Sequence, residues 1–270
     1  MPIPYHPWSP ISTLLLDPFV LFCLGCLITP LLVVSESDAE GLGTLHVRAF
    51  DVENWKAHFG DPAVLACCAF TFVAVLIASD YPALPSAETA SANWFLANGA
   101  IIHTAMDGMT GGLGFLPLMK DNYQKLDNRF SGTSASEDAV AVAQTTFRSE
   151  LFVMAPLCFL TYCAIYARSK YAPSLSLVTL SAQLWGTVMF VGPEIMTGCK
   201  NMVPIGITGC LSASYSPYEL LYFWFAVGAN FLWIIVPLRM MRGVAVSIAS
   251  TANVSSLCLR PLLLSCWETT

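Results

Sequence analysis

Residues 94–130 read WFLANGAIIHTAMDGMTGGLGFLPLMKDNYQKLDNRF. The first half is an apolar helical pattern that carries His103 and, four residues later, Asp107. Four residues are about 400° of rotation in an α-helix, which predicts that both side chains leave one face, one turn apart. The flanking residues are so apolar that we expect this helix to lie in a membrane. Ionisable side chains are costly there, so the pair calls for a functional explanation.

The composition of the whole chain also indicates a membrane protein. Of its 270 residues, 56% are hydrophobic and 11% are charged, and the mean hydropathy is +0.63. A soluble domain usually has about 25% charged residues. With a net charge of −6 and no basic tract, nucleic acid is not an expected partner. No histidine lies beside a cysteine pair, so we expect no metal site, and we expect no cleaved signal peptide.

Apolar runs predict an all-α integral membrane protein, a bundle of about five transmembrane helices. One extra N-terminal membrane segment, residues 11–34, is an open alternative because proline interrupts it. The five predicted spans are residues 62–79, 92–118, 147–167, 174–191 and 217–241.

The polar stretches between the spans predict the domain organisation. Residues 1–61 form an N-terminal segment with an apolar stretch and an acidic connector, for which we expect a solvated loop. Residues 62–243 form the transmembrane domain, which includes a second polar segment at 119–146. Residues 244–270 form a tail that is mildly apolar and that we expect to be disordered.

Four polar residues lie within or at the edge of the predicted spans: His103, Asp107, Glu150 and Asn230. An ionised side chain at the membrane centre costs roughly 3 kcal/mol, so we expect these four to face one another inside the bundle. One interpretation is a polar plug that fixes helix packing. The other is acid–base chemistry in a dry cavity, because burial favours a protonated carboxylic acid and histidine relays protons near neutral pH.

Two of the candidates also have simpler interpretations. Glu150 falls in the first turn of the predicted helix 147–167, where a carboxylate suits the helix dipole. Trp233 shares a helix face with Asn230, and its indole would stabilise a cation by about 2 kcal/mol when desolvated. Any single tryptophan, however, is also explained by packing or by anchoring at the membrane interface.

Four segments of the sequence, each weak as a motif by itself, form a specific pattern when their order and their polar residues are taken together. They are WFLANGAIIHTAMDG (94–108), KDNYQKLDNRF (120–130), QLWGTVMF (183–190) and LYFWFAVGANFLWIIVP (221–237). The set resembles the I-H-x-x-x-E-G helix, the Y-x-K-x-D-x-R-Y loop, the Q-x-Y-G-D-V-x-Y segment and the YFWF…N-x-L-W…P helix of the emopamil-binding protein family. These are the sterol Δ8–Δ7 isomerases of the EXPERA superfamily, and the resemblance covers over half of the chain.

The resemblance implies a helical bundle in the endoplasmic reticulum membrane that encloses a sterol-sized cavity and is often dimeric, which leaves a homodimer open. It implies that one acid protonates an alkene of a sterol or related lipophilic isoprenoid and that a base removes a neighbouring proton, with no cofactor or metal. The residues that it assigns to catalysis are His103, Asp107, Glu150, Asn230 and Trp233. The residues that we assign to substrate binding with it are Phe130, Trp185, Thr187 and Phe223.

Three departures from the family pattern affect the predicted function. Asp107 replaces the family's glutamate, Val153 a threonine and Thr187 an aspartate. These changes keep open a terpenoid or meroterpenoid isomerase or cyclase that uses the same acid–base residues. A non-catalytic sterol-binding membrane protein is a further alternative. A transporter is not indicated, because the sequence has no internal repeat.

Overall fold

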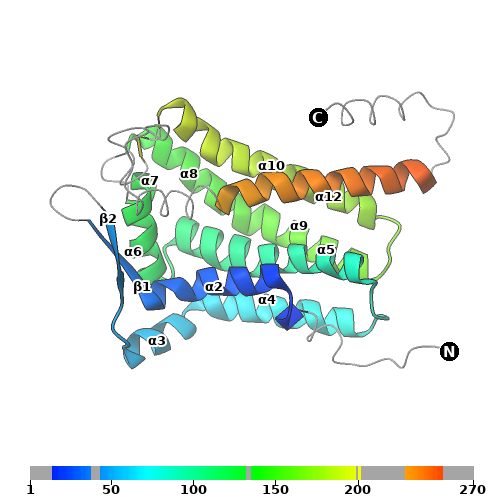
Figure 1. The fold of residues 1–270 in the computed structure, drawn as a ribbon, viewed down its shortest axis with the longest axis horizontal. Coiled ribbons are helices and arrows are strands. Elements are labelled where there is room, and N and C mark those ends of the chain that lie inside the picture. The colour runs from blue at the N-terminus through cyan, green and yellow to red at the C-terminus, as the bar shows by residue number, and fades with distance from the viewer. Residues whose placement is uncertain (1–13, 38–42, 132–134, 199, 202–228, 252–270) are drawn as a thin grey trace.

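The computed structural model describes residues 14–37, 43–131, 135–198, 200–201 and 229–251. Its elements are α2 (Pro18–Leu32), β1 (Val33–Ser37), β2 (Gly43–Val47), α3 (Val52–Phe59), α4 (Pro62–Ser79), α5 (Ser86–Ala97), η1 (Asn98–Gly112), α6 (Pro117–Leu126), α7 (Asn128–Ser131), α8 (Glu137–Ser149), η2 (Glu150–Met154), α9 (Ala155–Tyr166), α10 (Ala172–Met196) and α12 (Ala229–Thr251). The long helices lie side by side, and α6 crosses one end of the bundle (Figure 1).

The prediction of a helical membrane protein is confirmed. Four helical stretches of the described residues are long and apolar enough to cross a membrane: Pro62–Ser79, Glu137–Tyr166, Ala172–Met196 and Asn230–Ala249. Their outer faces carry exposed apolar side chains such as Phe72, Leu76, Phe152, Leu160 and Val178. A soluble protein rarely exposes so much apolar surface, whereas lipid solvates it well. The chain is therefore an integral membrane protein.

Helix α4 begins and ends where the apolar run predicted. Pro62 occupies its first turn, and the Asp61 carboxylate accepts the backbone N–H of Ala63 at 2.8 Å. The second oxygen of Asp61 accepts the N–H of Leu116 at 3.0 Å. Leu116 has a φ of 50° and lies at the turn between η1 and α6. One N-capping residue therefore also fixes the far end of η1.

Part of the N-terminal apolar run forms helix α2 in the described residues. Asp17 caps it by accepting the N–H of Phe19 at 2.9 Å, and its other oxygen accepts the Asn93 amide at 3.1 Å. Its 15 residues extend about 22 Å, which is less than the hydrocarbon core of about 30 Å. The buried residues of α2 are Val20, Cys23, Leu27, Pro30 and Leu31. Helix α2 therefore packs on the bundle beside α5 and η1.

The prediction of a solvated loop for the acidic connector is wrong. Strands β1 and β2 pair antiparallel, from Val33 opposite Val47 to Ser37 opposite Gly43. Helix α3 follows and packs on α2, where the buried His58 Nε2 lies 3.0 Å from the carbonyl oxygen of Leu27. The polar composition of the connector did not predict the hairpin, because the hairpin is formed by backbone hydrogen bonds between two segments of the connector.

The helix that contains Glu150 starts earlier than predicted. Helix α8 begins at Glu137, where Ser136 accepts the N–H of Ala139, and it continues through η2 into α9. Glu150 is therefore in the middle of a continuous helix, and the interpretation as a first-turn dipole partner is wrong. The polar segment 119–146 is largely helical, and α12 extends past residue 243 to Thr251.

The central helix has an unexpected hydrogen-bond pattern. From Asn98 to Gly112 it is a π-helix, with bonds from residue i to i+5, and η2 is a second, shorter one. The hydroxyls of Thr104 and Thr110 donate to the carbonyls five residues earlier, both at 2.7 Å. Such segments are rare and occur often at functional sites. Since a π turn needs more than four residues, Asp107 falls short of a full turn after His103.

Candidate active site

A histidine and a glutamate meet where the two π-helices touch. His103 Nδ1 of η1 lies 2.5 Å from Glu150 Oε2 of η2. The two residues are 3% and 9% exposed. Gly108 permits the approach, because a Cβ at this position would lie 2.5 Å from the Cβ of Leu151, the neighbour of Glu150. A side chain at Gly108 would hold the helices apart, so this glycine is part of the site's construction.

A glutamine of α10 completes the surroundings of His103. Gln183 Nε2 lies 3.2 Å from His103 Nε2 and donates to Cys158 Sγ at 3.7 Å. Gln183 Oε1 accepts the indole N–H of Trp94 at 3.1 Å. All of these side chains are buried. These hydrogen-bonded side chains, together with Glu150 in contact with His103, are defined here as the central network. The network joins five helical elements: α5, η1, η2, α9 and α10.

Trp233 is attached to the same network through an asparagine. Its indole N–H donates to Asn98 Oδ1 at 2.5 Å, and the Asn98 amide donates to the carbonyl of Trp94 at 2.7 Å. The ring of Phe19 stacks on Trp94 with centroids 4.2 Å apart, and the Trp94 and Trp233 centroids are 6.2 Å apart. The structure thus brings three predicted catalytic residues, His103, Glu150 and Trp233, into one connected group.

Asp107 follows His103 by four residues in η1. It is half-buried, and its charge interacts with those of Glu150 and His103. The second oxygen of Glu150, Oε1, faces α10 at Gly186, where an added Cβ would lie 3.2 Å away. The half-buried Asp107 carboxyl group thus interacts electrostatically with the buried His103–Glu150 pair.

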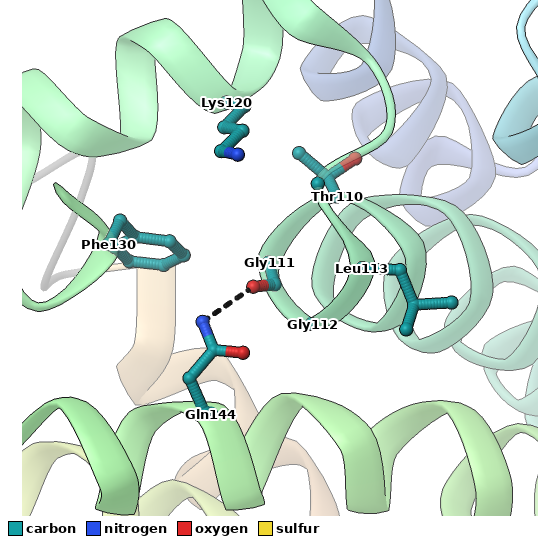
Figure 2. Close-up of a pocket in the computed structure, with 8 residues that line it drawn as sticks. Thr110, Gly111, Gly112, Leu113, Lys120, Phe130 and Gln144 are labelled. Atoms are coloured by element: carbon teal, nitrogen blue, oxygen red, sulfur yellow. Dashed lines mark hydrogen bonds between the residues drawn. The ribbon is translucent and has the colours of Figure 1, made fainter. Parts of the chain in front are cut away.

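Phe130 belongs to a neighbouring aromatic group. Its ring centroid is 4.9 Å from that of Tyr123 and 4.7 Å from that of Phe147. It also lines a pocket of about 200 Å³ at the end of η1, with Thr110, Gly111, Gly112, Leu113, Gly114, Lys120 and Gln144. Figure 2 shows Phe130 and Lys120 facing the glycines, and Gln144 donates to the Gly111 carbonyl at 3.1 Å. This pocket shares no lining residue with the central network.

The structure does not bring every predicted site residue to the network. Trp185 is 65% exposed, because it lies two residues from the inward-facing Gln183 on the same helix. Thr187 is buried, and its hydroxyl donates to the Gln183 carbonyl at 3.0 Å. Asn230 is half-buried near the start of α12. Phe223 lies outside the described residues.

Cys158 was not among the predicted site residues, and neither were three polar residues of the central network and its link to Trp233: Trp94, Asn98 and Gln183. All three stand in or beside the quoted motifs, but no role was assigned to them. A signal was available, because a glutamine or asparagine inside an apolar helix needs a buried partner. The sequence does not identify that partner, since Trp94 and Gln183 are 89 residues apart.

A second buried polar cluster, around Arg129, connects helical elements. Arg129 donates from Nε and Nη2 to Asp127, with the shortest contact at 2.6 Å, and lies 3.5 Å from Glu194 of α10. Its Nη1 donates to the carbonyl of Phe190 at 2.9 Å. The Asn201 amide completes the cluster by donating to Glu194 at 2.7 Å. These contacts fasten the α6–α7 corner to the end of α10.

Comparison with known proteins finds one family match, over part of the chain. Residues 116–243 match the family model described as EBP: EXPERA (EXPanded EBP superfamily). The matched segment contains Glu150, Gln183 and Trp233, whereas His103 and Asp107 precede it. Neither the curated proteins nor the solved structures give a match. Residues 116–243 therefore resemble the domain that defines the EXPERA superfamily.

Proposed function

We propose that this protein is an intramembrane isomerase that shifts a double bond in a sterol or related isoprenoid, in the endoplasmic reticulum membrane. The observation that carries the proposal is the buried His103–Glu150 contact at 2.5 Å with Asp107 beside it. Charged groups inside a membrane protein are costly unless they serve a purpose. The match of residues 116–243 to the EXPERA family model supports a sterol-related ligand.

The contacts favour a division of labour between the two carboxyl groups. Glu150 Oε2 lies 2.5 Å from the His103 imidazole, and we assign it the role of the base. Asp107, whose charge interacts with that of Glu150, is then assigned the role of the acid. The alkene's π electrons take the proton of Asp107 and leave a carbocation. Glu150 then removes a proton from the adjacent carbon, and that C–H bond's electrons form the new double bond.

Trp233 is suited to stabilise the positive intermediate. Its N–H is held by Asn98, so the ring has a fixed orientation. An indole face stabilises a desolvated cation by about 2 kcal/mol, which corresponds to roughly 30-fold in rate. We therefore expect Trp233→Leu to slow turnover by about that factor and Trp233→Phe to slow it less. Equal rates for both variants and the wild type would remove Trp233 from the mechanism.

The central experiment follows proton exchange. Purified protein in nanodiscs is incubated with Δ8 sterols in deuterated water, and the products are analysed by mass spectrometry. We expect a Δ7 product that carries one deuterium, and losses of 10²–10⁴-fold in Asp107→Asn and Glu150→Gln. The matched controls are Asp138→Asn and Glu137→Gln, exposed carboxylates at the start of α8. Full activity in either site variant would refute its assigned role.

A second candidate is an isomerase or cyclase of terpenoid or meroterpenoid metabolism that uses the same residues. It is favoured by Val153, which stands at the family's threonine position and is 52% exposed, and by the shorter Asp107. Deuterium incorporation into such alkenes, without turnover of Δ8 sterols, would select it. Sterol binding without exchange into any alkene would instead support a non-catalytic binding protein.

A further inference from the structure

We propose that Gln183, held by Trp94, fixes His103 in the tautomer that carries its proton on Nδ1, which makes Gln183 a positioning residue for Glu150. The indole N–H of Trp94 is a donor and has no acceptor atom. It lies 3.1 Å from the Gln183 side-chain oxygen. If the amide were turned over, two donor groups would face each other in a buried site. Trp94 therefore sets the orientation of the amide.

The orientation of the amide determines which nitrogen of His103 carries the proton. Gln183 Nε2 has two hydrogens and two neighbours, His103 Nε2 at 3.2 Å and Cys158 Sγ at 3.7 Å. Because the amide nitrogen only donates, His103 Nε2 must accept. In a neutral imidazole the proton is then on Nδ1, which lies 2.5 Å from Glu150 Oε2. The proton is thus on the ring nitrogen that contacts the carboxylate.

In this arrangement, Nε2 of His103 contacts Gln183 and Nδ1 contacts Glu150. The imidazole therefore acts through Glu150 and does not touch the substrate. Gln183 is 2% exposed, so water does not compete for its hydrogen bonds. The Thr187 hydroxyl donates to the backbone carbonyl of Gln183 at 3.0 Å. What Glu150 does for the reaction rests on the proposed function, whereas the tautomer of His103 does not.

The test is ¹⁵N NMR of the full chain in nanodiscs with labelled histidine. The chain has four histidines, and a His103→Asn variant identifies the signals of His103 by difference. We expect a protonated Nδ1 and an unprotonated Nε2 in the wild type. Gln183→Glu places acceptors where the amide hydrogens were, so we expect a proton to appear on Nε2. Gln144→Glu, the same change outside the network, leaves the His103 signals unaltered.

Two further variants separate positioning from misfolding. Trp94→Phe keeps an aromatic ring but removes the N–H, so we expect the single tautomer to become a mixture while the protein still unfolds in one cooperative transition. In the deuterium-exchange assay, Gln183→Leu should lose on the order of 10²-fold in kcat, because Glu150 is misplaced.

The outcomes distinguish this inference from the proposed function. A wild-type His103 with its proton on Nε2, or unchanged signals in Gln183→Glu, would overturn the inference whatever the enzyme's activity. A lost tautomer in Gln183→Leu with kcat within twofold of wild type would also overturn the positioning role. Correct tautomers without turnover of any alkene would count against the proposed function alone.

Discussion

Replacement of Gly108 by alanine should separate the two π-helices at the active site. A Cβ at this position would lie 2.5 Å from the Cβ of Leu151 and 2.5 Å from the carbonyl oxygen of His103. Ordinary van der Waals contact begins at 3.4 Å. The helices must therefore move apart by about 0.9 Å, the difference between these distances, or η1 must distort.

The expected cost follows from two effects. Overpacking of a close contact typically costs about 1–3 kcal/mol. A shift of 0.9 Å would also lengthen the His103–Glu150 contact from 2.5 Å to about 3.4 Å, the upper limit of a useful hydrogen bond. We therefore expect Gly108→Ala to lower both the stability and the turnover of the protein, the latter on the order of 10²-fold.

Gly112 in the same helix provides the matched control. A Cβ there would lie 3.4 Å from Phe147 and Arg148 atoms, which is ordinary contact. Alanine also favours helices over glycine by up to about 1 kcal/mol, so Gly112→Ala should be neutral or stabilising. The assay is thermal unfolding of purified variants in one detergent, with the proton-exchange rate as the second readout. Equal melting temperatures for the two variants would refute the close-contact reasoning.

Two other predictions concern groups outside the candidate spans. Burial lowers the pKa of His58 from its usual 6.5, so the unfolded chain binds its proton first and stability should fall as the pH drops below about 6.5. His58→Gln, which still donates to Leu27, should abolish this dependence in melting curves from pH 8 to 5; an unchanged slope would contradict it. Arg129→Met leaves its two carboxylate partners uncompensated and should cost about 3–5 kcal/mol. Lys56→Met, in an exposed pair with Glu53, should cost below about 1 kcal/mol, and similar losses in both would disprove the role of burial.

The predicted and observed bounds of the helices and strands agree where the ends have local sequence signals. Helix α4 was predicted to the residue because Asp61, Pro62 and Asp80 bound an apolar run whose ends are local signals. The start of α8 was missed because its first turns are polar and Ser136 is one cap candidate among several in SGTSASED. The hairpin was missed because neither strand has a pattern that predicts its partner.

The amino-acid sequence by itself determined that this protein lies in lipid and which polar residues are available for a buried site. Its low charge and long apolar runs required lipid, and the isolated polar residues within those runs indicated a buried site. These are properties of single segments, so periodicity and transfer free energy are sufficient to deduce them.

Only the tertiary structure decided which of these residues meet and in what chemical form. The π-helical pattern of η1 and the contact between Gly108 and Leu151 bring His103 to Glu150. Gln183 reaches the same histidine from 80 residues away. Hydrogen bonds between distant helices leave no period in either sequence segment, and so the tautomer of His103 and the roles of Trp94 and Asn98 followed from the packing alone.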